Sequence, residues 1–538
     1  MFVPRGGPEG AALRESKGTH VKELVYPRLL LPAVEQFGSK TTFIDGDHTG
    51  TLEDHLGRVQ RIASAMRSEL GIQPGDRFAV MATNSHEYLE LYHAAFFGGG
   101  IINPLNLRLA AAELELIIKD SGTKVCFVDF LFANNIDAIR DAAGIEKVVL
   151  IGPDLDSPHD LTYDELLEAG KAEMPPEPEE DQPVTLMYTG GTTGRPKGVL
   201  LDQRAHQLNL YHVMSVVDFS DQRTYLHQTP MFHAASMGGI LGIPASGSVS
   251  TFIALFDPEK VMDNIEEHQV DWTVMVPTMI NMVLSHPEFR PERLASLQDL
   301  TYGASPMPAE VLRRLLELYP DLRLSQGYGM TEAAAVLTFL RPEDHAQGGK
   351  LLRSAGRPVP GVRLSIQDEE GNLLAAGETG EVCAQAGNFM REYWQMPEAT
   401  EEVFRGGWYH TGDAGYLEDG YLYLVDRVKD MIVSGGENVY SAEVEDAIAS
   451  HPDVEQVAVI GIPHETWGEA VHAIVVPRAG AEPTEEAIIE HARQSIAGYK
   501  VPKSVEIRTE PLPLSGAMKI LKRELRRPYW EGQERTIG

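Results

Sequence analysis

Residues 189–198 read Thr-Gly-Gly-Thr-Thr-Gly-Arg-Pro-Lys-Gly and directly follow the apolar, strand-like run 184–188. Glycines let backbone N–H groups approach phosphate oxygens closely, threonine hydroxyls add donors, and Lys197 adds positive charge. Each charge-assisted hydrogen bond in such a loop contributes roughly 1.5–3 kcal/mol. The ordinary P-loop is excluded, because it needs Gly directly before Lys, whereas Pro196 precedes Lys197. The stretch predicts a polyphosphate-binding loop, with an unliganded glycine-rich surface loop as the alternative. The candidate ligands are Thr189, Gly190, Gly191, Thr192, Thr193, Gly194 and Lys197.

The segments that precede this loop alternate between helical and strand-like patterns. Apolar residues recur at helical spacing over 51–70, 87–97 and 134–143. Strand-like apolar runs cover 77–81, 124–130 and 147–151. This alternation is typical of a parallel α/β layer. The proline- and glutamate-rich stretch 172–183 can bury little apolar surface, so it is expected to be an exposed connector.

A different pattern begins after Gly420. A strand-like run at 421–426 follows an Asp-Gly turn, and a second strand is expected at 457–462. Thr484 has the position of a helix N-cap, and the helix it opens carries apolar residues to Ile496. The pattern predicts a small α+β unit of about a hundred residues.

Size and charge exclude several classes of protein. A chain of 538 residues exceeds what one hydrophobic core usually organises, so at least two domains are expected. With 43% hydrophobic residues, disorder is excluded as the default state. The formal charge of −33 argues against nucleic acid and anionic membrane surfaces as partners, because both repel such a chain.

Cysteine usage and hydropathy bear on the compartment. Cys126 and Cys383 are the only cysteines and lie far apart, which argues against a disulfide framework and fits reduced thiols. The first twenty residues contain no apolar segment, and no later stretch is long enough to span a bilayer. A cytoplasmic protein without an integral membrane segment is expected.

The loop at 189–198 resembles the phosphate loop of the adenylate-forming superfamily, which includes acyl-CoA synthetases, adenylation domains of nonribosomal peptide synthetases and beetle luciferases. Five further segments match the family in its own order, and the resemblance extends over about 41–526. These segments are Pro230–His233, Gln326–Glu332 (Gln-Gly-Tyr-Gly-Met-Thr-Glu), Tyr409–Asp413, Asp426–Glu445 and Ser515–Lys522.

The resemblance implies a fold and a division into domains. Residues 1–426 would form a large domain of layered α/β subdomains with a small β-barrel. Residues 427–430 would be a hinge, and 431–538 a mobile α+β domain.

The resemblance also assigns the nucleotide site. Tyr328 would stack on adenine, Thr331 would donate to the α-phosphate, and Glu332 would hold Mg²⁺, for which a carboxylate is a suitable hard ligand. Asp413 and Arg427 would contact the ribose. A core tyrosine, a solvated glutamate and a turn-capping aspartate are the alternatives. Gly327 and Gly329 belong to the same motif, and Gly303 and Ala304 match positions that border the acid.

Other family positions concern acid activation and domain movement. Lys519 matches the mobile lysine of adenylation, and His233 matches a position that lines the acyl channel. Lys429 matches the hinge, and Gly435 and Gly436 match the strand beside the pantetheine tunnel. Met518 departs from the pattern, because the family usually has Gly before the lysine. If this residue has positive φ, Met costs something like 1–2 kcal/mol of backbone strain.

The implied reaction has two steps. A carboxylate attacks the α-phosphorus of ATP to give acyl-AMP and pyrophosphate, while Mg²⁺, Thr193, Thr331 and Lys519 stabilise the developing charge. A thiol then displaces AMP, and free CoA is the expected acceptor. The expected substrates are therefore ATP, CoA and a small-molecule carboxylic acid of the fatty or aryl class.

Two alternatives stay open at this level. An adenylate-forming ligase could pass the acyl group to an amine and make an amide. A nucleotide- or acid-binding regulator could have lost adenylation through Met518. Neither the acid nor the oligomeric state follows from the sequence, and a homo-oligomer is not excluded.

Overall fold

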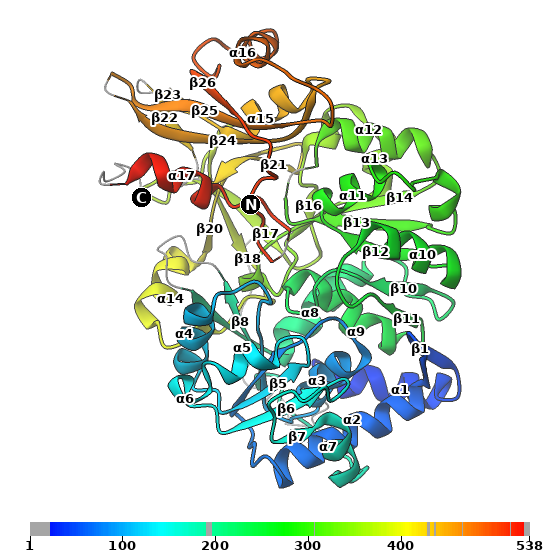
Figure 1. Cartoon of the computed structure of the whole chain (residues 1–538). Coiled ribbons are helices and arrows are strands. Elements are labelled where there is room, and N and C mark those ends of the chain that lie inside the picture. The colour runs from blue at the N-terminus through cyan, green and yellow to red at the C-terminus, as the bar shows by residue number, and fades with distance from the viewer. Residues whose placement is uncertain are drawn as a thin grey trace, which may run out of the picture.

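The computed structural model describes residues 22–189, 196–305, 307–427, 431–434, 437–464, 466–516 and 518–531, and every structural statement below concerns these residues. They form three sheets in a large N-terminal domain and one sheet in a small C-terminal domain (Figure 1). No helix among them is long and apolar enough to cross a bilayer. The architecture is the expected mixed α/β fold.

The first sheet carries the strands on both sides of the glycine-rich stretch. Its order is β19-β9-β8-β4-β3-β5-β6-β7, largely parallel, with β8 and β9 antiparallel. The strands are β3 (Arg77–Met81), β4 (Ile101–Pro104), β5 (Val125–Asp129), β6 (Lys147–Ile151), β7 (Leu161–Thr162), β8 (Pro183–Thr189), β9 (Lys197–Asp202) and β19 (Glu392–Tyr393). Their helices are α2 (Leu52–Ser68), α3 (His86–Phe96), α4 (Ala111–Ser121), α5 (Ala133–Asp137), α6 (Arg140–Ala143), α7 (Tyr163–Ala169) and α8 (Gln203–Met214).

Most of the expected elements in this part are confirmed, with one difference. The predicted helix at 134–143 is two short helices, α5 and α6, because Asn134, Asn135 and Asp137 are poor helix formers that do not sustain one continuous helix. The stretch 172–183 contains no helix and no strand before β8. The connector prediction is therefore confirmed.

The second sheet packs beside the first. Its order is β16-β15-β14-β13-β12-β10-β11-β1-β2, and α3, α8 and α9 lie between the two sheets (Figure 1). The strands are β1 (Thr41–Asp45), β2 (His48–Thr51), β10 (Thr224–His227), β11 (Val249–Phe252), β12 (Trp272–Met275), β13 (Asp299–Gly303), β14 (Arg323–Tyr328), β15 (Thr338–Leu340) and β16 (Arg357–Pro358). The helices are α1 (Pro27–Phe37), α9 (Met237–Ala245), α10 (Pro258–His268), α11 (Pro277–Leu284), α12 (Ala309–Leu318) and α13 (Pro342–Gln347), with short 3-10 turns η1 (Ala234–Ser236), η2 (Pro291–Leu294), η3 (Thr331–Ala333) and η4 (Gly349–Arg353).

The remaining two sheets are antiparallel or mixed. The barrel-like sheet has the order β17-β18-β20-β21, and the C-terminal sheet has the order β23-β22-β25-β24 with β26 beside β25. The first comprises β17 (Arg363–Gln367), β18 (Gly380–Gln385), β20 (Tyr409–Glu418) and β21 (Tyr421–Arg427), with α14 (Pro397–Val403) and η5 (Arg405–Gly407) nearby. The second comprises β22 (Ile432–Ser434), β23 (Glu437–Val439), β24 (Val454–His464), β25 (Gly468–Pro477) and β26 (Ser504–Ile507), with α15 (Ser441–Ala449), α16 (Glu485–Arg493) and α17 (Lys522–Trp530). Helix α16 has the predicted Thr484 cap but ends before Ile496.

A buried ionic cluster joins the amino ends of four neighbouring strands in the second sheet. Arg223, just before β10, donates from Nε to Asp271 Oδ1 at 2.5 Å and from Nη2 to Asp299 Oδ2 at 2.7 Å. Arg323, at the start of β14, donates from Nε to Asp299 Oδ1 at 2.9 Å. Because Asp271 directly precedes β12 and Asp299 opens β13, the cluster fixes the relative positions of these strand ends.

We expect Arg223→Leu to lower the free energy of unfolding of the large domain by about 3–5 kcal/mol, because it leaves the buried Asp271 carboxylate without its arginine and leaves Asp299 with Arg323 alone. The matched control is Arg313→Leu, which removes an exposed arginine paired with Glu310 and Glu317 on α12 and should cost less than about 1 kcal/mol. Urea unfolding followed by tryptophan fluorescence measures both. Equal losses of unfolding free energy in the two variants would contradict a stabilising role of the buried cluster.

Candidate active site

Residues matching the nucleotide motifs lie at the carboxyl ends of strands in the second sheet, opposite the ionic cluster. Gly303 ends β13, Tyr328 ends β14, and Thr331 and Glu332 open η3 immediately afterwards. In open α/β sheets, ligands bind outside the carboxyl ends of the strands. The topology therefore brings these four residues to the edge where a ligand is expected.

Two of the predicted glycines are required by close backbone packing. A Cβ on Gly303 would lie 2.3 Å from the carbonyl oxygen of Gly327, and a Cβ on Gly329 would lie 2.0 Å from that of Ala335. Ala304 has φ +67°, so the chain turns sharply as it leaves β13. These glycines shape the edge of the site whether or not they contact a ligand.

Tyr328 and Asp413 are brought together although 85 residues separate them. The Tyr328 hydroxyl donates to Asp413 Oδ2 at 2.7 Å, which joins the second sheet to the barrel-like sheet. Asp413 pairs in register with Arg427 across β20 and β21, so the backbone positions of the two expected ribose contacts are adjacent. The side chain of Arg427 lies outside the described part of the chain.

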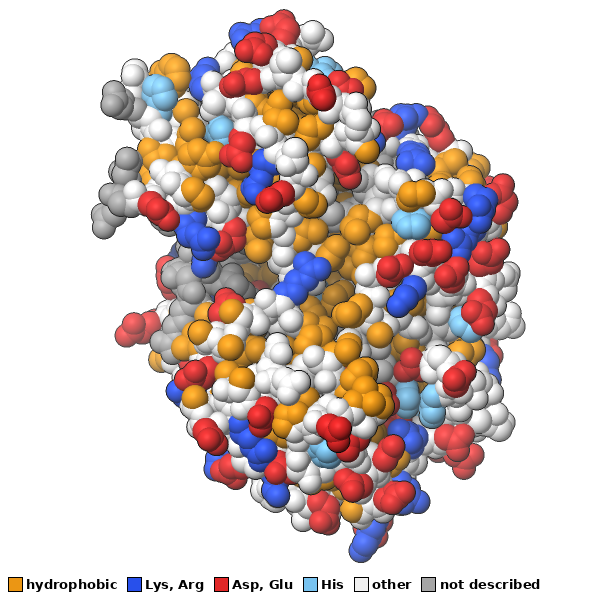
Figure 2. All heavy atoms as spheres, viewed as in Figure 1, with side chains coloured by type: hydrophobic (Ala, Val, Ile, Leu, Met, Phe, Trp, Pro, Cys, Tyr) orange, Lys and Arg blue, Asp and Glu red, His pale blue; other side chains and the backbone are white. Residues whose placement is uncertain are grey.

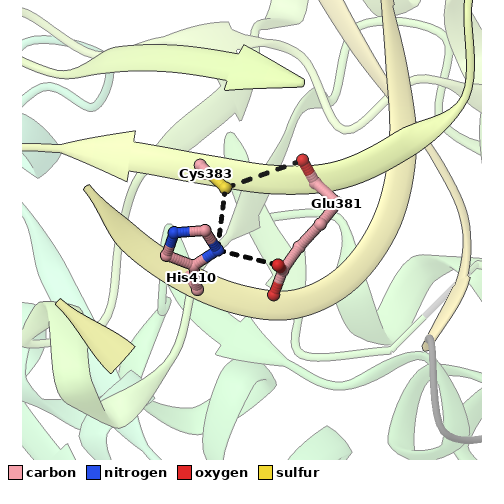
Figure 3. A group of neighbouring side chains, drawn as sticks. All are labelled: Glu381, Cys383 and His410. Atoms are coloured by element: carbon pink, nitrogen blue, oxygen red, sulfur yellow. Dashed lines mark hydrogen bonds and ion pairs between the residues drawn. The ribbon is translucent and has the colours of Figure 1, made fainter. Parts of the chain in front are cut away.

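A group that the sequence did not predict supports the part of β20 that carries Asp413: Glu381, Cys383 and His410 (Figure 3). Glu381 Oε1 accepts from the backbone N–H of Gly412 at 3.1 Å, and Oε2 accepts from His410 Nδ1 at 2.7 Å and from Arg405 Nη2 at 2.9 Å. Cys383 Sγ lies 3.3 Å from the same Nδ1. Because sulfur and carboxylate share one ring nitrogen, the three residues do not form a proton relay from thiol to carboxylate.

This group fixes the backbone that carries Asp413. Gly412 has φ +72°, and the Glu381 carboxylate holds its N–H in that conformation. Burial raises the pKa of the Cys383 thiol to about 12, so the sulfur is a neutral packing group. Short-range patterns could not reveal this arrangement, because the contact forms only when β18 pairs with β20.

Glu332 and Lys197 meet through a third residue. The hydroxyl of Tyr393 donates to Glu332 Oε1 at 2.8 Å, and Lys197 Nζ lies 4.6 Å from the centre of the Tyr393 ring. Lys197 opens β9, and Thr189 ends β8 directly opposite it. One side chain, Tyr393, therefore contacts both Lys197, near the end of the glycine-rich stretch, and Glu332, the carboxylate expected to hold Mg²⁺.

His233 directly precedes η1 and lies near Lys519. Its Nδ1 accepts from the backbone N–H of Ala235 at 3.2 Å, so the neutral ring carries its proton on Nε2. Burial, together with the smaller effect of the nearby Lys519 charge, lowers the pKa of His233 to about 3. His233 is consequently a neutral hydrogen-bond donor near pH 7, with the Lys519 ammonium in its vicinity.

The segment that carries Lys519 is docked on the large domain. Arg108 Nη1 donates to the carbonyl of Ser515 at 3.2 Å, and Thr278 Oγ1 donates to the carbonyl of Met518 at 2.8 Å. Figure 1 shows this segment, in red, returning from the C-terminal domain towards the middle of the molecule. Figure 2 shows apolar side chains around the same junction, interrupted by a basic group. The Lys519 segment therefore docks where Thr278 follows the carboxyl end of β12.

Met518 has φ +61°, as the family pattern of Gly at this position implies. Its side chain is 7% exposed and packs in the apolar cluster of α11 and α12, and Arg108 Nη2 lies 3.2 Å from its sulfur. Burial of a methionine side chain contributes about 1.5–3 kcal/mol, which offsets strain of about 1–2 kcal/mol. Packing of the Met518 side chain therefore stabilises its unfavourable backbone conformation.

Several predicted site residues lie outside the described part of the chain, so their positions stay predictions. They are Gly190, Gly191, Thr192, Thr193, Gly194, Lys429, Gly435 and Gly436.

We expect Glu381→Ala to raise the KM for ATP roughly tenfold or more with a smaller effect on kcat. The reason is that the Gly412 N–H and the His410 ring lose a charged acceptor, and hydrogen bonds to charged groups contribute about 1.5–3 kcal/mol. Glu381→Gln should lie between this variant and the parent, because an amide oxygen still accepts from Gly412. Steady-state kinetics with Glu401→Ala, exposed on α14, as control test it. An unchanged KM in Glu381→Ala would refute the assignment.

Comparison with known proteins agrees with this geometry. Residues 31–394 match the AMP-binding enzyme family, and residues 443–519 match the AMP-binding enzyme C-terminal domain. A feruloyl-CoA synthase from Amycolatopsis sp is 39% identical over 474 residues, covering 88% of this chain and 92% of that protein. A medium/long-chain-fatty-acid–CoA ligase from Mycobacterium tuberculosis is 32% identical over 564 aligned positions, covering 100% and 96%.

Among solved structures, the amide bond synthetase McbA from Marinactinospora thermotolerans superimposes with a TM-score of 0.82 at 28% identity, covering 94% of this chain and 100% of that one. The match to the family extends through both domains of the fold described above. The chain therefore belongs to the AMP-binding enzyme family of adenylate-forming ligases.

Proposed function

We propose that the protein is an ATP-dependent carboxylic acid:CoA ligase that makes an acyl-AMP and then an acyl-CoA. The observation that carries this proposal is the docking of the Lys519 segment on the large domain beside His233. We infer that a lysine from near the far end of the chain would thereby act at the carboxyl-end edge of the second sheet, where Tyr328 ends β14 and Glu332 follows in η3. Relatives that activate aryl and fatty acids support the assignment.

In the first step, the acid would lie near His233 and Lys519. The neutral imidazole donates from Nε2, and the ammonium stabilises negative charge on the carboxylate and the α-phosphate. Tyr328 would pack on adenine, Asp413 and Arg427 would accept and donate at the ribose, and Thr193 and Thr331 would donate to phosphate oxygens. These roles are proposed on the family motifs and on the positions of the described residues.

The carboxylate of Glu332 fits Mg²⁺, because it is a hard oxygen donor that follows the carboxyl end of β14, and only one of its oxygens, Oε1, accepts a hydrogen bond from a side chain within the described residues. The ion would supply charge neutralisation at the phosphates when bound. Tyr393 already orients this carboxylate in the protein alone.

In the second step, CoA would attack the acyl-AMP after the small domain has turned. We propose the division 1–426, hinge 427–430 with Lys429, and mobile domain 431–538, with Gly435 and Gly436 beside the incoming thiol. One site then assembles two sets of groups in turn. ATP and CoA are cytoplasmic metabolites, so we place the enzyme in the cytoplasm.

An aryl or a medium- to long-chain fatty acid is the proposed substrate class. The relatives that span nearly the whole chain act on these two classes. The apolar side chains around the junction of the domains in Figure 2 are compatible with either class.

Amide formation is the second candidate, and the structural likeness to an amide bond synthetase favours it. In that case, an amine would take the place of CoA. The two functions share the first step and differ only in the acceptor.

Supplying ATP, Mg²⁺ and a panel of aryl and fatty acids should give pyrophosphate release and, with CoA, a thioester of the expected mass. Lys519→Met should slow adenylation roughly 10²- to 10³-fold, because it removes the positive charge beside the reacting oxygens. The same variant should convert chemically made acyl-AMP and CoA to thioester at close to the parent rate. If amines yield product and CoA does not, amide formation replaces the first proposal.

The regulator alternative is tested at Met518. We expect the parent protein to adenylate its acid and Met518→Gly to change the rate by less than about tenfold, because relief of φ strain is offset by lost packing. Pyrophosphate release measures both proteins, with Met282→Ala, on an exposed position of α11, as control. A silent parent that becomes active on Met518→Gly would instead identify Met518 as an inactivating residue.

A further inference from the structure

Tyr393 lies in the short edge strand β19, next to the end of the phosphate loop. Its strand pairs antiparallel with β9, with Tyr393 opposite Val199. On its two sides, Trp394 N donates to the Gly198 carbonyl at 2.7 Å and Arg391 N donates to the Leu200 carbonyl at 2.9 Å. The backbone of Tyr393 is therefore tied to the strand that begins with Lys197.

The side chain of Tyr393 reaches from this first sheet to the second one. Its hydroxyl donates to Glu332 Oε1 at 2.8 Å, and the neighbouring Met390 N donates to the Glu332 carbonyl at 2.7 Å. Tyr393 is 5% exposed, and its own N–H donates to Thr400 Oγ1 at 3.0 Å in α14. Tyr393 is consequently held by the pairing of its strand with β9, by its hydroxyl on Glu332 and by its N–H on Thr400.

The two ends of the side chain contact two different charges. The ring faces the Lys197 ammonium at 4.6 Å, a distance at which a cation is attracted to the aromatic face. The hydroxyl occupies one oxygen of Glu332, and within the described residues Oε2 accepts no hydrogen bond.

We propose that Tyr393 is a positioning residue that couples Lys197 to Glu332, so that the phosphate-binding cation and the Mg²⁺-holding carboxylate are oriented as one unit. This inference rests on the proposed function. Partners that orient a ligating carboxylate typically change metal affinity or activity 10- to 100-fold when they are removed. The coupling links the two sheets at the point where they meet the triphosphate.

The two contacts can be separated by substitution. Tyr393→Phe keeps the ring over Lys197 and removes the donor to Glu332, so the Mg²⁺ concentration needed for half-maximal ATP binding should rise about tenfold or more. ATP binding without Mg²⁺ should change less than twofold. Tyr393→Leu removes both contacts and should additionally weaken Mg²⁺-free ATP binding roughly two- to fivefold.

Isothermal titration calorimetry of ATP at several Mg²⁺ concentrations measures these changes without reference to turnover. Tyr421→Phe is the matched control, because the Tyr421 hydroxyl, in β21 of the barrel-like sheet, likewise donates to a carboxylate, that of Asp344 in α13, at 2.5 Å. It should leave the Mg²⁺ dependence unchanged. Thermal melting of all variants identifies those that fail to fold.

A double-mutant cycle with Glu332→Gln decides whether the two residues act together. In that background Tyr393→Phe should have no further effect on the Mg²⁺ dependence. Additive effects, or a Tyr393→Phe protein with the parent Mg²⁺ dependence, would overturn the inference. If the parent binds ATP with Mg²⁺ but releases no pyrophosphate with any acid, the proposed function fails while the calorimetric test of Tyr393 still holds.

Discussion

A chain with a formal charge of −33 repels a triphosphate at long range, so the carboxylates of the proposed site have to be held at defined positions. The structure meets this constraint with side chains that donate to each carboxylate. Tyr328 donates to Asp413, Tyr393 donates to Glu332, and His410 donates to Glu381. Two of the three donors are tyrosines, which hold a carboxylate in place without cancelling its charge.

In the parallel part of the second sheet, the stabilising ionic cluster and the proposed ligand site lie at opposite ends of the strands. The buried cluster around Arg223 and Asp299 joins the amino ends of β10, β12, β13 and β14, while the residues proposed to bind the nucleotide follow the carboxyl ends of β13 and β14. An ionic cluster of this kind keeps the strands in register at one edge. The other edge remains open for loops whose geometry is set by close backbone contacts such as that of Gly303 with Gly327.

The Lys519 segment, which we propose to be mobile, contacts the large domain through a small set of interactions. Its contacts with the large domain are a few hydrogen bonds from Arg108 and Thr278, together with the buried side chain of Met518. Each hydrogen bond contributes about 1 kcal/mol and burial of the Met518 side chain about 1.5–3 kcal/mol, so these contacts favour the docked arrangement by only a few kcal/mol. The strained φ of Met518 lowers its stability further, which suits a segment proposed to leave the site between two steps.

The sequence by itself determined the α/β class, the glycine- and threonine-rich stretch at 189–198, and the order of the family motifs, because periodicity and short motifs are local properties of the chain. It also indicated the unusual backbone at Met518, since a family glycine implies positive φ. It did not determine the break between α5 and α6, where weak local propensities compete with packing.

Only the tertiary structure decided the partners of the site carboxylates. Tyr393 lies 61 residues from Glu332, and His410 lies 29 residues from Glu381, so neither contact has a signature within one motif. Such contacts depend on which strands become neighbours, and one residue of slip in β19 or β20 would turn these side chains to the opposite face. Strand order and register, which no local pattern encodes, bring these donors within hydrogen-bond distance of the carboxylates.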